Sequence, residues 1–322
     1  MTAIEDDLIK AAKSGDNDAY ARLVAPLRAD LHAHCYRLLG STTDAEDALQ
    51  EALVGAWRGL HRFEGRSSVR TWLYRIATNA CLRALERKPP RVLPIDYGPA
   101  GDPHDFQNIP LSETIWIQPY PTAEGESETR ENVELAFIAA LQHLPGSQRA
   151  VLILRDVLGF SGAETADILG TTTTSVYSSL QRAHKAIESR RPKSSQQATL
   201  RALGDKAISD LVKRYVDAWD RNDVDTIVEM LTEDASFTMP PLASWYRGRT
   251  AIAEFLRNWP LAPDKQWRST PTRANGQLAF RYDLLDRSTG DYVPHSLKII
   301  TLRGSQISEV TSFLSVDIKP WL

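Results

Sequence analysis

The first 90 residues carry apolar side chains three and four positions apart, the spacing that gives a helix one buried face. Residues 40–44, Gly-Ser-Thr-Thr-Asp, supply a helix stop followed by a new N-cap. A loop then interrupts the pattern, and Ser67 or Ser68 is placed to cap the next helix. Two consecutive prolines end that helix, because proline lacks an amide donor and clashes with the preceding turn. The pattern predicts an all-α helical bundle over residues 1–90.

The periodicity is lost after residue 90 and returns in another form. Residues 91–132 are rich in Pro, Gly, Asp and Glu, which indicates an extended linker. Helical spacing resumes over 133–192, and a short polar linker, 193–204, follows it. Residues 205–322 begin with one helical run, 207–231, and continue with strand-like alternation. Helices first and strands later predict a separate α+β domain at this end of the chain.

Composition narrows the class of protein. A chain of 322 residues with 42% hydrophobic content has room for two or three compact units. It has no apolar run long enough to cross a bilayer, and its acidic start lacks the features of a signal peptide. Cys35 and Cys81 are too few for a disulfide framework or a zinc site, so we expect small buried side chains. These features predict a cytoplasmic protein with no membrane partner.

The overall charge of −3 hides a sharp internal division. Residues 61–91 contain eight Arg or Lys against two acids, a net charge of +6. Residues 92–134 contain nine acids against one Arg, a net charge of −8. A basic stripe is the usual footprint of a polyanion-binding surface. The acidic neighbour either masks that surface or imitates the anion.

Four polar side chains share one face of the helix predicted after residue 44. They are Glu46, Asp47, Gln50 and Glu51, three and four positions apart. Such a face is either simply solvated or a complementary surface for a protein partner, where charge sets orientation and association rate. Its position directly before the basic segment favours a partner surface.

Residues 63–87 combine the groups that hold an unpaired nucleic-acid strand. Cations bind phosphates, flat rings stack on bases, and a polar pocket receives a base taken out of the stack. The candidates are Arg66, Ser67, Arg70, Trp72, Arg75, Asn79 and Arg83. For Trp72 alone, a place in the core is the simpler interpretation.

A helix-turn-helix is predicted inside residues 133–192. Ser161 and Glu164 match a capping box at the start of its first helix, and Gly170 makes the turn. In this motif the second helix enters the DNA major groove, where its early residues meet base edges. The side chains outside its apolar stripe are Ser175, Tyr177, Ser178, Ser179 and Arg182. A helix-turn-helix used only for protein contact is the alternative.

In this order, the acidic face, the basic segment and the helix-turn-helix resemble extracytoplasmic-function (ECF) sigma factors, in particular their SigG-like group. The resemblance implies that the acidic face holds the clamp helices of the largest subunit of core RNA polymerase, with the polymerase flap as a second contact. It further implies that the basic segment captures the melted −10 element of promoter DNA and that the second helix reads the −35 element. Tyr177 and Ser179 stand where related factors commonly have Lys or Arg, which predicts weaker phosphate contact.

The resemblance extends to the acidic linker by position and charge. In sigma factors this segment threads through the polymerase active-centre cleft, so its charge would imitate nucleic acid on basic walls. A plain solvated tether is the alternative.

Residues 205–322 resemble the SnoaL-like fold, an α+β cone, through runs such as 224–237 and 247–255. Cones of this kind enclose a pocket, and five of the eight tryptophans lie in this domain. The candidate pocket residues are Tyr215, Trp219, Asp234, Trp245, Arg281 and His295. Some members of the fold are ketosteroid-isomerase-type enzymes with a carboxylate base. The resemblance implies a regulatory domain that contacts its own sigma domains, with a small-molecule sensor and an enzyme as alternatives.

The combined prediction is a multidomain sigma factor made of two all-α sigma domains and an α+β cone. We expect no catalytic residues, no metal site and no cofactor. One rival is a plain helix-turn-helix regulator that binds duplex DNA without polymerase, and the acidic face argues against it. The other is a SnoaL-like isomerase or small-molecule sensor fused to a DNA-binding regulator. An isomerase would need a clear acid/base pair, which the spacing does not reveal.

Overall fold

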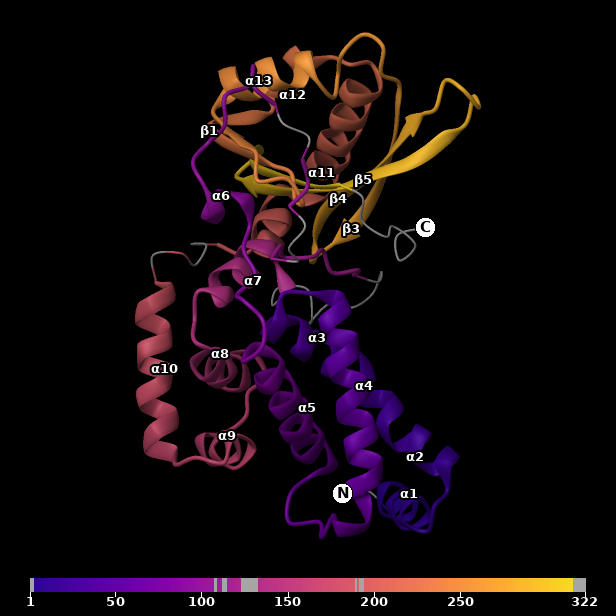
Figure 1. The fold of residues 1–322 in the computed structure, drawn as a ribbon, viewed down its shortest axis with the longest axis vertical. Helices are drawn as coiled ribbons and strands as arrows, with labels where there is room; N and C mark the ends of the chain where they lie inside the picture. Colours follow the sequence, from indigo (N-terminus) through magenta and orange to yellow (C-terminus); the bar gives the residue numbers. More distant parts are fainter. Residues whose placement is uncertain are drawn as a thin grey trace. The chain divides into compact units, whose positions relative to one another are not determined.

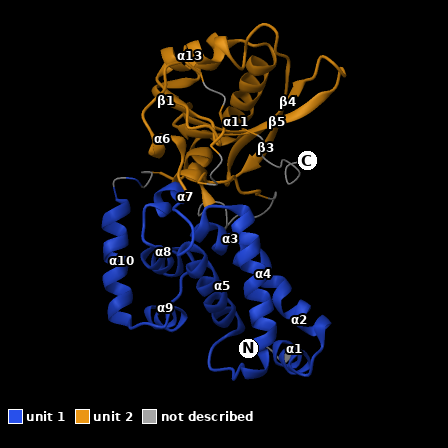
Figure 2. Ribbon diagram, viewed as in Figure 1, with its two compact units in different colours: residues 1–90, 137–191 blue, residues 91–136, 192–322 orange. Residues whose placement is uncertain are grey.

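The computed structural model of the chain describes residues 3–106, 109–111, 115–122, 133–188, 190 and 194–314. Two compact units are formed (Figure 2). Unit 1 consists of residues 1–90 and 137–191, and unit 2 of residues 91–136 and 192–322. The two predicted helical blocks therefore share one unit, while the segment between them belongs to the other.

Unit 1 begins with the predicted helical bundle (Figure 1). Its elements are α1 (Ala3–Lys13), α2 (Asn17–Val24), η1 (Ala25–Leu27), α3 (Arg28–Leu39), α4 (Thr42–Gly59), η2 (Leu60–Arg62) and α5 (Val69–Leu85). Gly40 ends α3 with a φ of 66°, and the Ser41 hydroxyl caps α4 by accepting the amide of Asp44 at 3.1 Å. Ser68 caps α5 in the same way through the amide of Thr71 at 3.0 Å. The helix stop and both caps expected from the sequence are confirmed.

The core of this bundle is closely packed around large side chains. Tyr36 and Tyr74 are buried, and Cys35 and Cys81 are buried free thiols, as expected. His34 is also fully buried and shares a 2.8 Å hydrogen bond with the Thr78 hydroxyl. Burial, reinforced by nearby arginines, lowers the pKa of His34 to about 3, so the imidazole is neutral at pH 7.

The second half of unit 1 contains the helix-turn-helix. Its elements are α7 (Leu135–Gln142, whose first two residues belong to unit 2), α8 (Gly146–Leu152), the π-helical η4 (Ile153–Val157), α9 (Gly162–Leu169) and α10 (Thr173–Ile187). The predicted capping box is present: the Ser161 hydroxyl accepts the Glu164 amide at 3.1 Å, and the Glu164 carboxylate accepts the Ser161 amide at 2.8 Å. Gly170 ends α9 in the left-handed region, as expected for the turn.

A buried arginine joins the two halves of unit 1. The Arg149 guanidinium donates to the Leu38 carbonyl at the end of α3, to the Leu144 carbonyl at 3.0 Å and to the Gln142 side chain at 2.6 Å. Arg149 is 2% exposed, and burial lowers its pKa to about 10, so it stays charged at neutral pH. Carbonyl groups at helix ends lack partners within the helix, and a cation at this point satisfies them.

Unit 2 is built on one six-stranded sheet, which confirms the predicted α+β domain. The strands are β1 (Leu231–Thr238), β2 (Trp245–Arg247), β3 (Trp267–Ala274), β4 (Gln277–Leu285), β5 (Tyr292–Arg303) and β6 (Gln306–Leu314), and the helices are α6 (Pro94–Tyr97), α11 (Gln196–Asp220), α12 (Val224–Glu229) and α13 (Arg249–Asn258). The strand order is β2-β1-β6-β5-β4-β3. Only the β1–β6 pair is parallel, and the other pairs are antiparallel.

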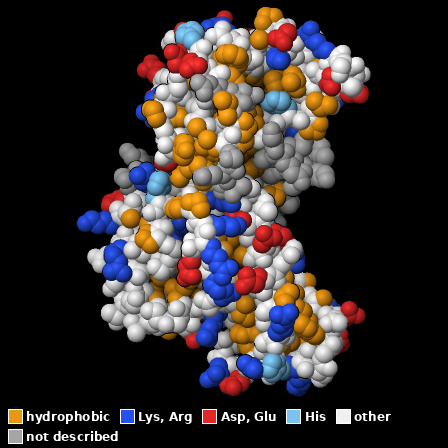
Figure 3. All heavy atoms as spheres, in the orientation of Figure 1, with side chains coloured by type: hydrophobic (Ala, Val, Ile, Leu, Met, Phe, Trp, Pro, Cys, Tyr) orange, Lys and Arg blue, Asp and Glu red, His pale blue; other side chains and the backbone are white. Residues whose placement is uncertain are grey.

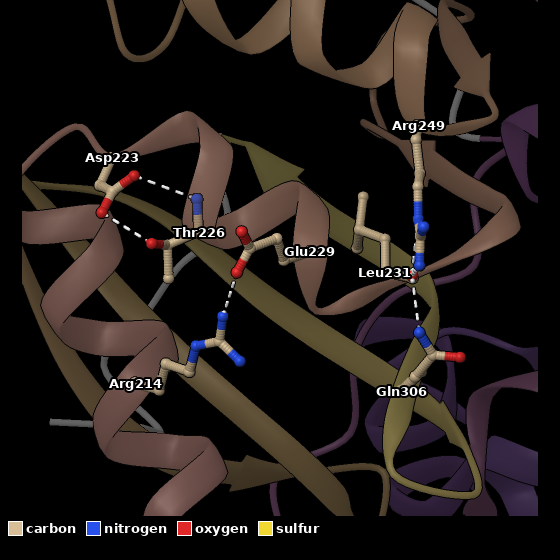
Figure 4. A network of polar contacts seen from close by, with 7 residues as sticks. All are labelled: Arg214, Asp223, Thr226, Glu229, Leu231, Arg249 and Gln306. Carbon is tan, nitrogen blue, oxygen red and sulfur yellow. Dashed lines mark hydrogen bonds and ion pairs between the residues drawn. The ribbon is translucent and has the colours of Figure 1, made fainter.

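The helical run expected over 207–231 is two helices. Asp223 interrupts it by capping α12 through the Thr226 amide at 3.0 Å, so α11 and α12 turn back on each other (Figure 4). Arg214 on α11 then pairs with Glu229 on α12 at 2.5 Å. In addition, α11 begins at Gln196, inside the segment assigned to the second linker, and Gly204 breaks it with a φ of 76°.

The segment after residue 90 has little regular structure, as expected, but it is attached to the sheet domain. Trp245 Nε1 donates to the Gly98 carbonyl at 2.8 Å, and the Gly101 amide donates to the Trp245 carbonyl at 2.8 Å. Asn275 holds the segment at two further points, accepting from the Tyr120 amide at 2.8 Å and donating to the Val133 carbonyl at 2.7 Å. The linker contributes only main-chain groups to these four contacts, so its composition gave no sign of them.

Among the described helices, none has both the length and the apolar surface to cross a bilayer.

Candidate nucleic-acid interface and a second cavity

The acidic face lies on α4, where its four members have different surroundings. Glu46 accepts hydrogen bonds from Arg28 at 2.8 Å and from Gln50 at 3.0 Å. Glu51 pairs with Arg83 of α5 at 2.6 Å. Asp47 and Gln50 are exposed. Glu46 and Glu51 thus pair with arginines of α3 and α5, and Asp47 and Gln50 extend the face into solvent.

A polar cavity of about 580 Å³ lies beside the start of α5 in unit 1. Five of the seven strand-capturing candidates line it: Arg66, Ser67, Trp72, Arg75 and Asn79. Trp72 packs on Phe63 with ring centroids 5.0 Å apart, so it forms a wall of the cavity and a part of the core at once. Cation, ring and amide therefore meet in one hollow, as capture of an unstacked base requires.

The cavity also has members that sequence reasoning did not select. Arg62 and Ile76 line it, and so does Asp167 from α9 of the helix-turn-helix. The Asp167 carboxylate lies 3.8 Å from the Arg75 guanidinium. Arg62 belongs to the basic segment, so the sequence offered a signal for it. Nothing in the local sequence indicated a contact between α5 and α9.

The remaining two candidates of this group lie outside the cavity. Arg70 stacks on Phe160 and Tyr74, with its guanidinium carbon 4.2 Å and 5.0 Å from the ring centroids. It also donates to the Leu158 carbonyl at 3.2 Å. Arg83 is the partner of Glu51 on α4. Both arginines join elements of unit 1 in this structure.

Helix α10 presents the predicted base-reading residues on its outer face. Ser175, Tyr177, Ser178 and Arg182 are exposed, while Ser179 is half-buried and accepts a hydrogen bond from Arg182 at 3.1 Å. Tyr177 lies over the start of α9, because a Cβ added at Gly162 would stand 2.8 Å from its hydroxyl. On the face of unit 1 seen in Figure 3, Lys and Arg side chains alternate with acidic ones.

Unit 2 contains a second, mainly apolar cavity of about 340 Å³. Of the six expected pocket residues, Trp219 and His295 line it. Tyr215 is buried beside Trp219, with ring centroids 6.2 Å apart, but is not part of the wall. The other three lie elsewhere: Asp234 pairs with Arg303 on the surface, Trp245 bonds Gly98, and Arg281 pairs with Asp283.

Among the lining residues that sequence reasoning missed, Lys298 is the most deeply buried ionisable one. It lies on β5, is 3% exposed and lines the cavity. Its Nζ stands 2.9 Å from the ring centroid of Trp219 and 3.5 Å from that of Tyr282. Burial lowers the pKa of Lys298 well below its ordinary value. A lone lysine in a strand-like run carries no sequence signal of such a position.

Family models agree with this division of the chain. Sigma-70 region 2 matches residues 23–89, Sigma-70 region 4 matches residues 134–187, and a SnoaL-like domain matches residues 212–310. The helical bundle with its polar cavity, the helix-turn-helix and the sheet domain thus correspond to the parts of a sigma-70-type protein that carries a SnoaL-like domain.

Comparison with individual proteins identifies the group of sigma factors to which the chain belongs. The chain is 39% identical over 317 residues to the ECF RNA polymerase sigma factor SigG of Mycobacterium tuberculosis, covering 96% of this chain and 84% of that protein. It is 29% identical over 183 residues to SigW of Bacillus subtilis, covering 56% of this chain and 92% of SigW. The crystal structure of the M. tuberculosis ECF sigma factor SigJ superposes with a TM-score of 0.59 at 22% identity, covering 92% of this chain and 98% of SigJ. The chain belongs to the ECF RNA polymerase sigma factors, and both the expected family and the expected fold class are confirmed.

Proposed function

We propose that the chain binds core RNA polymerase in the cytoplasm, brings it to promoters with −10 and −35 elements and starts transcription. The observation that carries this proposal is the polar cavity beside α5, where Arg66, Trp72 and Asn79 lie together. A cation, a ring and an amide in one hollow suit a base taken out of the stack. Residues 1–90 would act as the −10 domain, 133–192 as the −35 domain and 91–132 as the linker between them.

The acidic face of α4 is the proposed contact with the clamp helices of the polymerase's largest subunit. Asp47 and Gln50 are open to a partner, and the pairs Glu46–Arg28 and Glu51–Arg83 fix the helix that carries them. Exposed charges of this kind steer association more than they add affinity. The helix-turn-helix would contact the polymerase flap and place α10 in the −35 major groove.

Unit 2 is proposed to regulate the sigma domains in cis. Its hydrogen bonds to Gly98, Tyr120 and Val133 support this role, because these residues belong to the segment that connects the two DNA-binding halves. The rival isomerase role needs a carboxylate base beside the substrate. Among the described residues that line the cavity of unit 2 there is no Asp or Glu.

The first test is promoter-directed transcription in vitro with purified core polymerase and the full chain. We expect transcripts from discrete start sites. Asn79→Ala should lower open-complex formation about tenfold, since a bidentate hydrogen-bond pair between an amide and a base is worth roughly 1–3 kcal/mol. Asn17→Ala, an exposed position on α2, is the matched control. A chain that binds duplex DNA but neither binds core polymerase nor starts transcription would instead be a plain helix-turn-helix regulator.

The polymerase surface is tested separately by Asp47→Ala combined with Gln50→Ala. Both side chains are exposed, so the fold should be unaffected and the affinity for core polymerase should fall, by slower association above all. Surface binding kinetics at two salt concentrations measure this, with Asp7→Ala on α1 as control. Unchanged association of the double variant would remove α4 from the interface.

A further inference from the structure

The cavity of unit 2 has an unusual distribution of charge. Its wall is formed largely by aromatic and aliphatic side chains, among them Phe237, Phe255 and Trp267. The ionisable groups described in the wall are Lys265, His295 and Lys298, and the other polar ones are Ser296 and Ser312. All ionisable groups of the described lining are therefore basic, and most of the remaining lining is apolar.

Lys298 is the deepest of these groups. Its amine points at the faces of Trp219 and Tyr282, and within the part of the chain that the structure describes it forms no ion pair. Aromatic faces attract a cation, but a buried amine without a counter-ion remains costly. An anion inside the cavity would remove that cost, because it would complete a buried pair.

His295 adds a second polar contact at the same wall. Its ring lies 5.0 Å from that of Trp267, and its Nδ1 is buried without a hydrogen-bond partner among the described residues. Burial, together with Lys298 and Lys265, lowers the pKa of His295 to about 4. At neutral pH the ring is therefore an uncharged hydrogen-bonding group beside the amine.

We propose that this cavity binds a small molecule with an apolar, preferably aromatic, body and a single carboxylate, for which Lys298 is the counter-ion. A volume of about 340 Å³ is at the small end of ligand pockets, which favours a body of one or two rings. This site goes beyond the proposed sigma function, and binding is expected whether or not unit 2 alters transcription.

The site also has a direct connection to the linker. Phe106, from the segment between the sigma domains, lines the cavity and packs on Phe255 and Trp259 with ring centroids 5.4 Å and 5.1 Å apart. A ligand in the cavity therefore touches the segment that joins the −10 and −35 halves. Ligand binding and the position of the linker are therefore coupled, because each changes the free energy of the states that the other favours.

The test is binding of matched acids and amides to the full chain by calorimetry at pH 7. The probes are benzoate, naphthalene-2-carboxylate and decanoate, each paired with its carboxamide. We expect at least one acid to bind about tenfold or more tightly than its amide, as for a buried charge pair. If no acid is preferred over its amide in any of the three pairs, the proposal is wrong, and this comparison needs no variant.

Lys298→Met then assigns the counter-ion. The variant should bind the acid and its amide with equal affinity. The control is Lys213→Met, because Lys213 is exposed on the same helix as Trp219, and this variant should keep the preference for the acid. Circular dichroism checks that both variants are folded. An undiminished preference in folded Lys298→Met would overturn the assignment of Lys298.

Discussion

Two buried basic side chains of this protein have opposite surroundings. Arg149 donates to carbonyl oxygens of three residues, Leu38, Gln142 and Leu144, so its charge is matched by oriented dipoles. Lys298 faces aromatic rings and has no such acceptors among the described residues. The surroundings of Arg149 are typical of a structural role, and those of Lys298 are typical of a binding site.

Arg149→Met should destabilise unit 1 by about 3 kcal/mol, since the carbonyls of Leu38, Gln142 and Leu144 would lose their donor while remaining buried. Chemical denaturation measures the change. Arg58→Met, at an exposed position of α4, serves as control and should shift the free energy of unfolding by less than about 0.5 kcal/mol. Equal losses in the two variants would show that the Arg149 network adds nothing.

His34 predicts a stability that falls in acid. Its pKa of about 3 in the folded protein is below the ordinary 6.5, so the unfolded chain binds the proton first as the pH drops. Between pH 6.5 and 3 the free energy of unfolding should therefore decrease by up to about 1.4 kcal/mol per pH unit from this group. His34→Gln should lack that part of the slope. The difference between the two proteins cancels the surface acids that titrate in both, and parallel curves would contradict the prediction.

At the scale of elements, α9 places an acid in the wall of the polar cavity beside α5, which is the proposed −10 site. Asp167 stands in the cavity wall next to Arg75, where a phosphate or base would otherwise bind. Asp167→Asn should raise the affinity of the free chain for a single-stranded −10 oligonucleotide severalfold, because it removes a repulsive charge of the same sign as the strand. Fluorescence anisotropy measures it.

Asp156→Asn is the matched control, since Asp156 pairs with His184 at 2.6 Å and does not line the cavity. A similar gain in both variants would mean that general charge, and not the cavity, is responsible.

The elements themselves were largely predictable, because their signals are local. Ser161 with Glu164, Gly170 and Ser68 each specify a helix end within four residues. Alternation in the sequence indicated strands β1, β4, β5 and β6 of unit 2, but it did not indicate β2 and β3. The break at Asp223 was missed because apolar spacing continues across it, and the position of Lys298 was missed because burial of one lysine depends on tertiary packing. Likewise, Asp234 looked like a pocket acid, but strand register places it on the surface.

At the scale of the whole molecule, the proposed regulatory role of unit 2 leads to a prediction about truncation. A chain ending at Arg191 keeps both sigma-domain matches and loses the sheet domain. We expect its promoter-directed transcription to differ from that of the full chain, because the linker loses its contacts with Trp245 and Asn275. Transcription in vitro on several promoters measures the change and its sign. Identical activity of the two forms on all promoters would count against regulation in cis.

The attachment of the linker to the sheet domain limits the distance that the linker can span between two promoter elements. Freed and fully extended, residues 91–136 could span roughly 150 Å, far more than two neighbouring DNA elements require. The hydrogen bonds at Gly98, Tyr120 and Val133 divide this tether into shorter loops and reduce the usable length. By shortening the linker, unit 2 would limit which spacings between the −10 and −35 elements are tolerated.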